Sequence, residues 1–522
     1  MTYSKKIVSN TAYHAAGRVW QLAIILFLTP LILSYLGDEQ FALWALFWTF
    51  STYFMFMDFG LGISLVRETA RCGSKGEHFI ISQALNSLLV FYMLLGGITL
   101  LLAWLLSPQI ITGLNISNEM ATLVSEMLHW GVLIFVLIGL VNTLAALLRG
   151  LQRYDLITKA MFFVSFPNLL GTYYVLERGF GIIGLLWVVT AVYVLQVILL
   201  LFYSKRVMPE LVFGARLASW QLIKEMLPFG ARLQVSKFAE LASYQADKIL
   251  LALLMPVQFV TMYDLGAKVA TLMRDLPYSL TSAVFPAASE MHGQDDFDRL
   301  WKMYDIGSKY LLVTTLPMLF GLWLTAHLVI GMWLGFVSEY VYQSVLILSF
   351  AYWMVVSLAM SFSVGTGMGW SKPVMQSALL QAFLNISLSY WLIQEIGFAG
   401  ALCGTAIAIT IANTILYFRF CIHFERPIII EVSRLWLVIK GNIPAVIACG
   451  LFVFMGDQWL EWGDRFMSIL LFVGAVIVYV VTYVLSLRAF QVFDREDLRL
   501  LEGKVPMIGW LVNSPTQKEE KH

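Results

Sequence analysis

The sequence predicts an all-α polytopic membrane protein of about 14 transmembrane helices, built as two pseudo-symmetric six-helix lobes plus an appended helix pair. Three observations lead to this fold class: an apolar composition, many long apolar segments and an internal repeat. Hydrophobic residues make up 59% and charged residues 13% of the 522 residues, against about 45–50% and about 25% in soluble proteins. The mean hydropathy is +0.78. A net charge of +1 gives no indication of a nucleic-acid partner.

Fourteen segments are long and apolar enough to cross a bilayer, which takes about 20 residues of helix. In chain order they are Ala16–Leu36, Phe41–Ile63, Phe79–Leu106, Leu123–Leu148, Leu156–Leu176, Ile182–Tyr203, Trp220–Leu254, Val257–Ala288, Tyr304–Ile330, Val341–Gly365, Val374–Ile393, Gly400–Phe420, Trp436–Met455 and Phe466–Leu487. The seventh and eighth are the least apolar. The connections between them are short, so no loop is long enough to fold as a soluble domain.

The distribution of Lys and Arg supports this count and orients the chain. With a cytoplasmic N-terminus, 25 cations fall in inner connections, at the inner ends of spans or in the C-terminal tail and two in outer loops, while seven lie deeper within spans. Such a bias is what the positive-inside rule requires of a correct topology. We therefore expect both termini in the cytoplasm. The four cysteines are scattered and match neither a disulfide framework nor a zinc site, and we expect no metal and no cofactor.

An internal repeat divides the chain. Gln40-Phe41 recurs as Gln258-Phe259, Asp58 as Asp275, Asn168 as Asn385, and Gly179-Phe180 as Gly397-Phe398, at offsets of 217 or 218 residues. Six helices per copy give both copies the same orientation, a plan that recurs in transporters. The predicted parts are an N-terminal lobe (1–203), a cytoplasmic linker (204–219), a C-terminal lobe (220–422), two appended helices (423–487) and a cytoplasmic tail (488–522).

Charged and polar residues are concentrated on the spans that open each repeat. Insertion of one charge at a span centre costs about 2.5–3.5 kcal/mol, so such charges need a partner, water or a function. The seventh and eighth spans each carry a polar strip within one helical face, and the first two spans carry further charges. The set of charged residues that lie deeper within these spans is Arg18, Asp58, Arg232, Lys237, Glu240, Asp247, Lys248, Asp264, Lys268, Arg274 and Asp275.

Two interpretations of this set stay open. The carboxylates and cations could pair between helices, or they could line a hydrated pathway; for any one residue the two are equally supported, and for the whole set a wet pathway is favoured. Asp58 begins the sequence Asp-Phe-Gly and Asp275 begins the sequence Asp-Leu-Pro. Gly and Pro at these positions favour local helix breaks, so we expect both aspartates to act as hinges. No Walker motif, metal-ligand spacing or catalytic domain is evident, so we expect a protein that is not an enzyme.

Several segments resemble the polysaccharide transporter family, the Wzx-type flippases of the MATE-like MOP superfamily. The first is Leu33-Ser-Tyr-Leu-Gly-Asp-Glu-Gln-Phe-Ala-Leu-Trp-Ala-Leu46, followed by Asp58-Phe-Gly-Leu-Gly62 and Arg67. Leu147-Leu-Arg-Gly-Leu-Gln-Arg-Tyr-Asp155 resembles the family's Gly-x-x-x-Tyr turn. Met226-Leu-Pro-Phe-Gly230, Asp247-Lys248 and Phe285-Pro286 resemble its second half. Two features depart from the family pattern. Within the spans, acidic residues are nearly as numerous as basic ones, and two further spans follow the twelve that are usual in the family.

The resemblance implies a flippase that moves a polyprenyl-diphosphate-linked oligosaccharide from the inner to the outer leaflet by alternating access. Its setting would be O-antigen or exopolysaccharide assembly in the bacterial inner membrane, among membrane lipids and beside polymerase and chain-length proteins. It implies substrate-binding roles for Arg18, Arg232, Lys237, Lys268 and Arg274. Arg suits a diphosphate because its donors bind two oxygens at once. Should transport be ion-coupled, the candidate sites are Glu240, Asp247 and Asp264.

Two other functions compete. A MATE-type ion-coupled exporter of cationic small molecules would have a cavity dominated by acids and aromatics, and the cations of these spans count against it. A lipid II flippase fits the fourteen spans, whereas the first-span residues resemble the polysaccharide branch more closely. A glycosyltransferase or polymerase is disfavoured because the outer loops are short.

Overall fold

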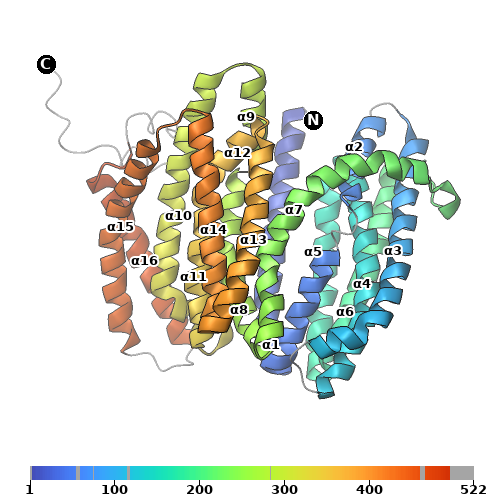
Figure 1. Cartoon of the computed structure of the whole chain (residues 1–522), viewed down its shortest axis with the longest axis horizontal. Coiled ribbons are helices and arrows are strands. Elements are labelled where there is room, and N and C mark those ends of the chain that lie inside the picture. The colour runs from blue at the N-terminus through green and yellow to red at the C-terminus, as the bar shows by residue number, and fades with distance from the viewer. Residues whose placement is uncertain are drawn as a thin grey trace. The chain divides into compact units, whose positions relative to one another are not determined.

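The computed structural model describes residues 3–54, 59–73, 76–113, 118–281, 284–458 and 465–493, and every regular element within these ranges is helical. The chain divides into two compact units, Met1–Thr261 and Met262–His522. The first unit holds α1 to α7 and the start of α8, and the second holds the rest of α8 and α9 to α16 (Figure 1).

The helices of the first unit are α1 (Tyr3–Phe54), α2 (Leu61–Gly73), α3 (His78–Gly113), α4 (Asn118–Gly150), α5 (Tyr154–Glu177), α6 (Gly181–Val207), the short 3-10 helix η2 (Ala215–Leu217) and α7 (Trp220–Leu254). Those of the second are α8 (Gln258–Thr281), α9 (Val284–Gly293), α10 (Phe297–Leu334), α11 (Glu339–Ser357), α12 (Ala359–Gly367), α13 (Ser371–Ile396), α14 (Phe398–His423), α15 (Ile428–Asp457) and α16 (Arg465–Ala489).

Each of the fourteen predicted spans coincides with one helix or with consecutive helical segments. The first span and most of the second lie in the single element α1, whose backbone breaks at Gly37, where φ is 70°, and the second span ends in α2. Pro or Gly at such a break is tolerated in a membrane helix when neighbours satisfy the freed backbone groups. The tenth span is divided into α11 and α12. Within the described ranges, nine helices meet a stricter length and hydropathy requirement for crossing a membrane.

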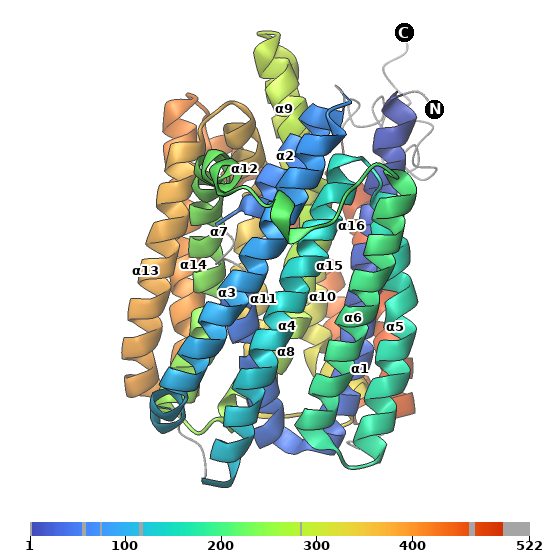
Figure 2. The same cartoon turned by 90° about the vertical axis from the view of Figure 1, so that its right-hand side faces the viewer.

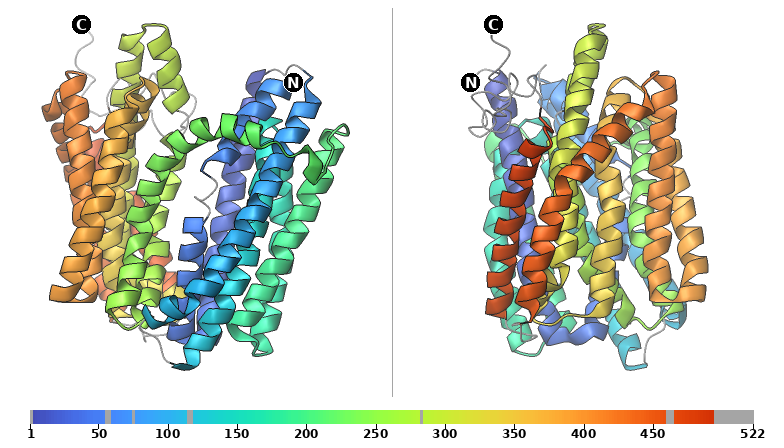
Figure 3. Two further views of the ribbon diagram at one scale, coloured as in Figure 1. Left: turned by 45° about the vertical axis from the view of Figure 1, so that its right-hand side comes forward. Right: turned by 90° about the vertical axis from the view of Figure 1, so that its left-hand side faces the viewer.

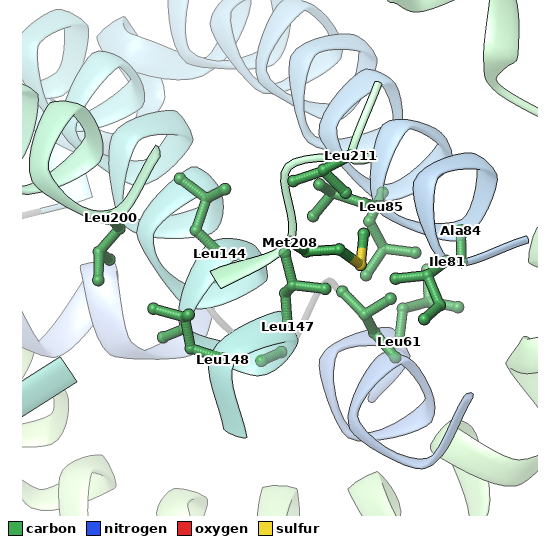
Figure 4. Packing of buried hydrophobic residues seen from close by; sticks show 14 of the residues in the cluster. Leu61, Ile81, Ala84, Leu85, Leu144, Leu147, Leu148, Leu200, Met208 and Leu211 are labelled. Atoms are coloured by element: carbon green, nitrogen blue, oxygen red, sulfur yellow. The ribbon is translucent and has the colours of Figure 1, made fainter. Parts of the chain in front are cut away.

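The core of the first unit forms where α2, α3, α4 and α6 meet the connection that precedes α7. Figure 2 shows α3, α4 and α6 side by side, and Figure 4 shows Leu61, Leu85 and Leu147 packed with Met208. These side chains are buried to 3% exposure or less. Ile223 and Met226 of α7 join the same cluster. The division between the compact units falls after Thr261, in the first turn of α8.

Glycine permits the closest helix approach in this core. A Cβ atom on Gly150, at the end of α4, would lie 2.5 Å from Cβ of Thr69 and 2.9 Å from the carbonyl oxygen of Val66, both on α2. The chain then turns through residues 151–153 and begins α5 at Tyr154. The predicted Gly-x-x-x-Tyr turn is thus a real helix connection, and its glycine is needed for packing.

The second unit has its core around α10, and α15 and α16 are part of it. The buried cluster joins Leu316 of α10 and Trp353 of α11 to Cys449 of α15 and Tyr479 of α16. The right-hand view of Figure 3 shows α15 and α16 lying side by side at the C-terminal end of the colour scale. The appended pair is therefore packed into the unit through an extensive apolar interface.

The repeat has one structural counterpart within each unit. The helices α5 and α6 are joined through Gly179, with φ 76°, and α13 and α14 are joined through Gly397, with φ 64°. A positive φ is readily adopted by glycine and costs other residues free energy. The two glycines that match in sequence thus serve the same kind of tight turn between paired helices.

Candidate functional site

The charged strip of α8 forms ion pairs along its own helix. Lys268 and Asp264, one turn apart, make a close ion pair, in which the Asp264 side chain is 7% exposed and the Lys268 side chain 26% exposed. Arg274 Nε donates to Asp275 Oδ1 at 3.1 Å. The Arg274 guanidinium also lies over the Tyr352 ring of α11, with its carbon 5.3 Å from the ring centroid. Both described cations of the predicted set in this unit are therefore held by carboxylates.

These ion pairs lower the free-energy cost of placing charged side chains on α8. A carboxylate left alone at this depth would be strongly disfavoured, whereas a neighbouring ammonium or guanidinium group compensates it. Arg274 gains a further cation–π contact, which is worth about 0.5–2 kcal/mol depending on desolvation. The geometry supports ion pairing for these four side chains, and the Lys268 side chain is partly exposed.

A second polar strip lies on α1 and α7 in the first unit. Thr49 Oγ1, on the part of α1 after the Gly37 break, donates to Gln245 Oε1 of α7 at 3.3 Å. Asp247 is fully buried and interacts electrostatically with Tyr53. The Tyr53 ring also meets Phe238 of α7, at a centroid distance of 6.2 Å. The structure thus brings the second predicted span and the seventh together along polar side chains.

The remaining predicted residues are placed only in part. Arg18 lies on α1, and Arg232, Lys237 and Glu240 lie on α7, but their side chains are outside the described part of the structure. Asp58 lies outside the described residues altogether. The assignment of these five residues stays a prediction.

The two predicted hinges have different surroundings. After residues 55–58, the chain passes through Phe59 and Gly60, both with positive φ, before α2 begins. The helical path of the second span is therefore interrupted next to Asp58. Asp275, in contrast, lies inside α8, which continues past Pro277 to Thr281. Proline removes a backbone donor and favours a kink there.

One charged cluster was not found by sequence reasoning. Asp305 on α10 binds two arginines, with its Oδ1 atom 2.5 Å from a terminal nitrogen of Arg426 and 3.2 Å from one of Arg434. The Arg426 guanidinium also lies over the rings of Trp301 and Tyr304. The partners are more than 100 residues apart in sequence, so neither helical spacing nor a motif could have indicated the cluster.

An apolar pocket opens among α1, α3 and α4 of the first unit. Its lining includes Leu46, Phe50, Met127 and Gly131, and it contains none of the predicted charged residues. Within the described ranges, no group of three or more His, Cys, Asp or Glu side chains is arranged to hold a metal ion.

Sequence comparison identifies the family. A family model described as "Polysaccharide biosynthesis protein" matches residues 35–341, which is more than half of the chain. The chain belongs to this polysaccharide biosynthesis protein family. The matched region begins just before the Gly37 break and ends at the start of α11, so it contains the polar strips of α1, α7 and α8. No curated protein sequence matches the chain.

Solved structures show the fold of this family member. An inward-facing multidrug resistance MATE family transporter of the MOP superfamily aligns with a TM-score of 0.66 at 15% identity, covering 78% of this chain and 94% of that one. The lipid II flippase MurJ, in an inward closed conformation, aligns with a TM-score of 0.64 at 14% identity over 91% of this chain and 99% of its own. A MOP superfamily transporter from Pyrococcus furiosus aligns with a TM-score of 0.59 at 16% identity, covering 81% of this chain and 96% of that one. The polysaccharide biosynthesis protein is therefore a multi-pass membrane protein with the MOP superfamily fold.

Proposed function

We propose that the protein is a flippase that moves a polyprenyl-diphosphate-linked oligosaccharide from the inner to the outer leaflet, for O-antigen or exopolysaccharide assembly. The family match carries this proposal, because it covers both polar strips. Alternating access would expose the cargo to each side of the membrane in turn. The proposal includes a location in the bacterial inner membrane with both termini in the cytoplasm, where polymerase and chain-length proteins of the same pathway would be partners.

Cations on α8 would bind the diphosphate and any acidic sugars. Arg274 is held in place by Asp275 and by the Tyr352 ring, so its planar donor array is ordered before a ligand arrives. A preordered guanidinium loses little entropy when it binds two phosphate oxygens. Lys268 would add a compact charge two turns of helix away. Arg18, Arg232 and Lys237 complete the proposed cationic set.

The membrane potential favours the proposed direction. An anion that moves from an inside-negative compartment to the outside gains about 2.3 kcal/mol per charge per 100 mV. Protein cations that moved with the diphosphate would reduce this gain. Coupling to protons or sodium is the alternative, and Asp247, Glu240 and Asp264 are its proposed sites. Among these, Asp247 is fully buried next to Tyr53, where a change of charge state would be felt strongly.

A transport experiment with a charge swap tests the proposal and its site. The full chain is placed in liposomes with a fluorescent polyprenyl-diphosphate saccharide, and leaflet transfer is followed by quenching. Variants are Arg274→Gln, Lys268→Gln and the exchange Asp264→Lys with Lys268→Asp. Lys309→Gln serves as the control, since Lys309 is a cation on α10 that lies over the Phe493 ring.

The outcomes separate binding from pairing. If Lys268 binds the substrate, both Lys268→Gln and the exchange lose transfer, whereas a purely structural pair would be restored by the exchange. Transfer by all variants equally would keep the function and reject the α8 site. Absence of transfer by the unaltered protein, with uptake of a cationic dye, would favour a MATE-type exporter. Transfer of lipid II alone would favour a lipid II flippase.

A further inference from the structure

We infer that the connection between α6 and α7 is a preformed docking surface for the anionic phospholipid headgroups of one leaflet. The inference does not depend on the proposed substrate. It concerns residues Lys205 to Lys224, which include the predicted inter-lobe linker and the first turns of α7. Figure 2 shows this connection crossing the ends of the α3 and α4 helices.

The connection is pinned to α3 by side-chain hydrogen bonds. Asn86 uses both ends of its amide: Nδ2 donates to the Val212 carbonyl at 2.7 Å, and Oδ1 accepts from the Gly214 N–H at 2.9 Å. Ser82 Oγ accepts from the Val212 N–H at 3.2 Å. Ser87, the next residue of α3 after Asn86, accepts from the Ser219 N–H through its Oγ atom at 2.8 Å. The backbone of this connection is therefore fixed at Val212, Gly214 and Ser219.

Apolar residues of the connection divide into a buried and an exposed set. Met208 and Leu211 are 3% and 0% exposed and belong to the core of the first unit. The next residues, Val212 and Phe213, point outward with 51% and 37% exposure, and Trp220 is 61% exposed. Because the hydrogen bonds fix the backbone, these side chains cannot turn inward to hide from water. An exposed apolar set of this kind indicates an interaction surface.

The charged residues of the same segment indicate which kind of partner would bind there. Four exposed cations, Lys205, Arg206, Arg216 and Lys224, lie in the same segment as the apolar residues, against two exposed carboxylates, Glu210 and Glu225. Basic residues next to exposed aromatic side chains are typical of segments that lie on anionic lipid. Lys205 is further held by donation to the Pro209 carbonyl at 3.1 Å.

The position along the chain supports a membrane partner. The candidate span of α6 is Gly181–Val207, so the connection begins where that span ends, at headgroup depth. Trp is enriched at this depth because its ring is apolar and its N–H is polar. A soluble protein partner would have to reach this surface past the headgroups. The predicted topology places it on the cytoplasmic leaflet, which carries the anionic lipids.

Fluorescence in nanodiscs tests the inference. A polarity-sensitive bimane label is attached at Phe213→Cys in a Cys403→Ser background, since Cys403 is the free cysteine in the described part that is not buried. The label is read in full-length protein as phosphatidylglycerol replaces phosphatidylcholine. A blue shift that rises with the phosphatidylglycerol fraction is expected. In Arg216→Gln the fraction needed for half of the shift should rise about fivefold, because each cation near an anionic surface is worth about that factor in affinity.

A matched control and a second variant keep the test decisive. Lys372→Gln removes an exposed cation on α13, outside this surface, and should leave the titration unchanged. A chloride titration should reverse the shift, because these cations are exposed and screened by salt. A label that stays equally polar in both lipids, or an equal loss in Arg216→Gln and Lys372→Gln, would overturn the inference.

Discussion

Removal of the Tyr483 hydroxyl should destabilise the second unit through a carbonyl on a different helix. Pro317 lies inside α10 and has no N–H, so the carbonyl oxygen of Val313, four residues earlier, lacks its helical donor. The Tyr483 hydroxyl of α16 donates to that oxygen at 2.8 Å. Tyr483 and Val313 are 8% and 6% exposed, which excludes water as a ready substitute.

The expected loss in the free energy of unfolding follows from these contacts. In Tyr483→Phe the ring is retained, and the Val313 carbonyl loses the donor that compensates for Pro317. A buried polar group left unsatisfied costs about 1–3 kcal/mol, while interhelical hydrogen bonds in membrane proteins average about 0.6 kcal/mol and reach about 1.7. We expect a loss of about 1–2 kcal/mol in the free energy of unfolding, because this acceptor has no donor in its own helix.

A double-mutant cycle isolates the cause. Pro317→Ala restores an N–H opposite the Val313 carbonyl, so Tyr483→Phe in that background should cost less than half of its cost in the native background. The four proteins are compared by equilibrium unfolding in mixed micelles, with helix content followed by circular dichroism. Equal costs of Tyr483→Phe in both backgrounds would refute the reasoning, since the hydroxyl would then have no special link to the proline.

Three further predictions concern other contacts. Gly404→Ala should lower the free energy of unfolding by about 1–3 kcal/mol, because a Cβ there would lie 2.7 Å from the Ser389 backbone. The control Gly97→Ala, with open space around the added Cβ, should leave the free energy of unfolding nearly unchanged in the same assay. Asp305→Asn should lower stability by about 1 kcal/mol, since two partly exposed arginines lose their carboxylate, and an unchanged unfolding midpoint would contradict this. Burial raises the pKa of the Cys72 thiol to about 11, above its usual value near 8.5. The thiol therefore stays protonated between these pH values, and the free energy of unfolding falls as pH rises through them. The difference in thiolate absorbance between the native protein and Cys72→Ala should break near pH 11, and a break near pH 8.5 would contradict this.

Sequence pattern was sufficient for the helical elements. Apolar segments of about 20 residues predict membrane helices because the bilayer core demands that length, and within the described residues thirteen of the fourteen predicted segments are helical almost throughout, while the second is interrupted at Phe59 and Gly60. The seventh, Trp220–Leu254, has the same bounds as α7 despite its many charges. The repeat glycines Gly179 and Gly397 could be matched because a tight turn with positive φ favours glycine.

Sequence spacing can indicate charge pairs only where they are local. The spacing of Asp264 and Lys268 already indicates an i,i+4 pair, and the structure contains it. Arg426 and Asp305 are 121 residues apart, and no periodicity relates them. Arg426 was therefore interpreted as one more inner-loop cation, whereas packing of the α14–α15 connection against α10 makes it the partner of a carboxylate.

The sequence by itself determined local properties of each helix: its length, its apolar character and the charged residues that can pair with others on the same helix. These depend on neighbours within a few residues. Only the tertiary structure decided that Asn86 pins Val212 and Gly214, and that Tyr483 compensates for the donor missing at Pro317. The physical reason is that a hydrogen bond between distant segments leaves no periodic trace in either one, and becomes visible only when packing brings donor and acceptor within about 3 Å.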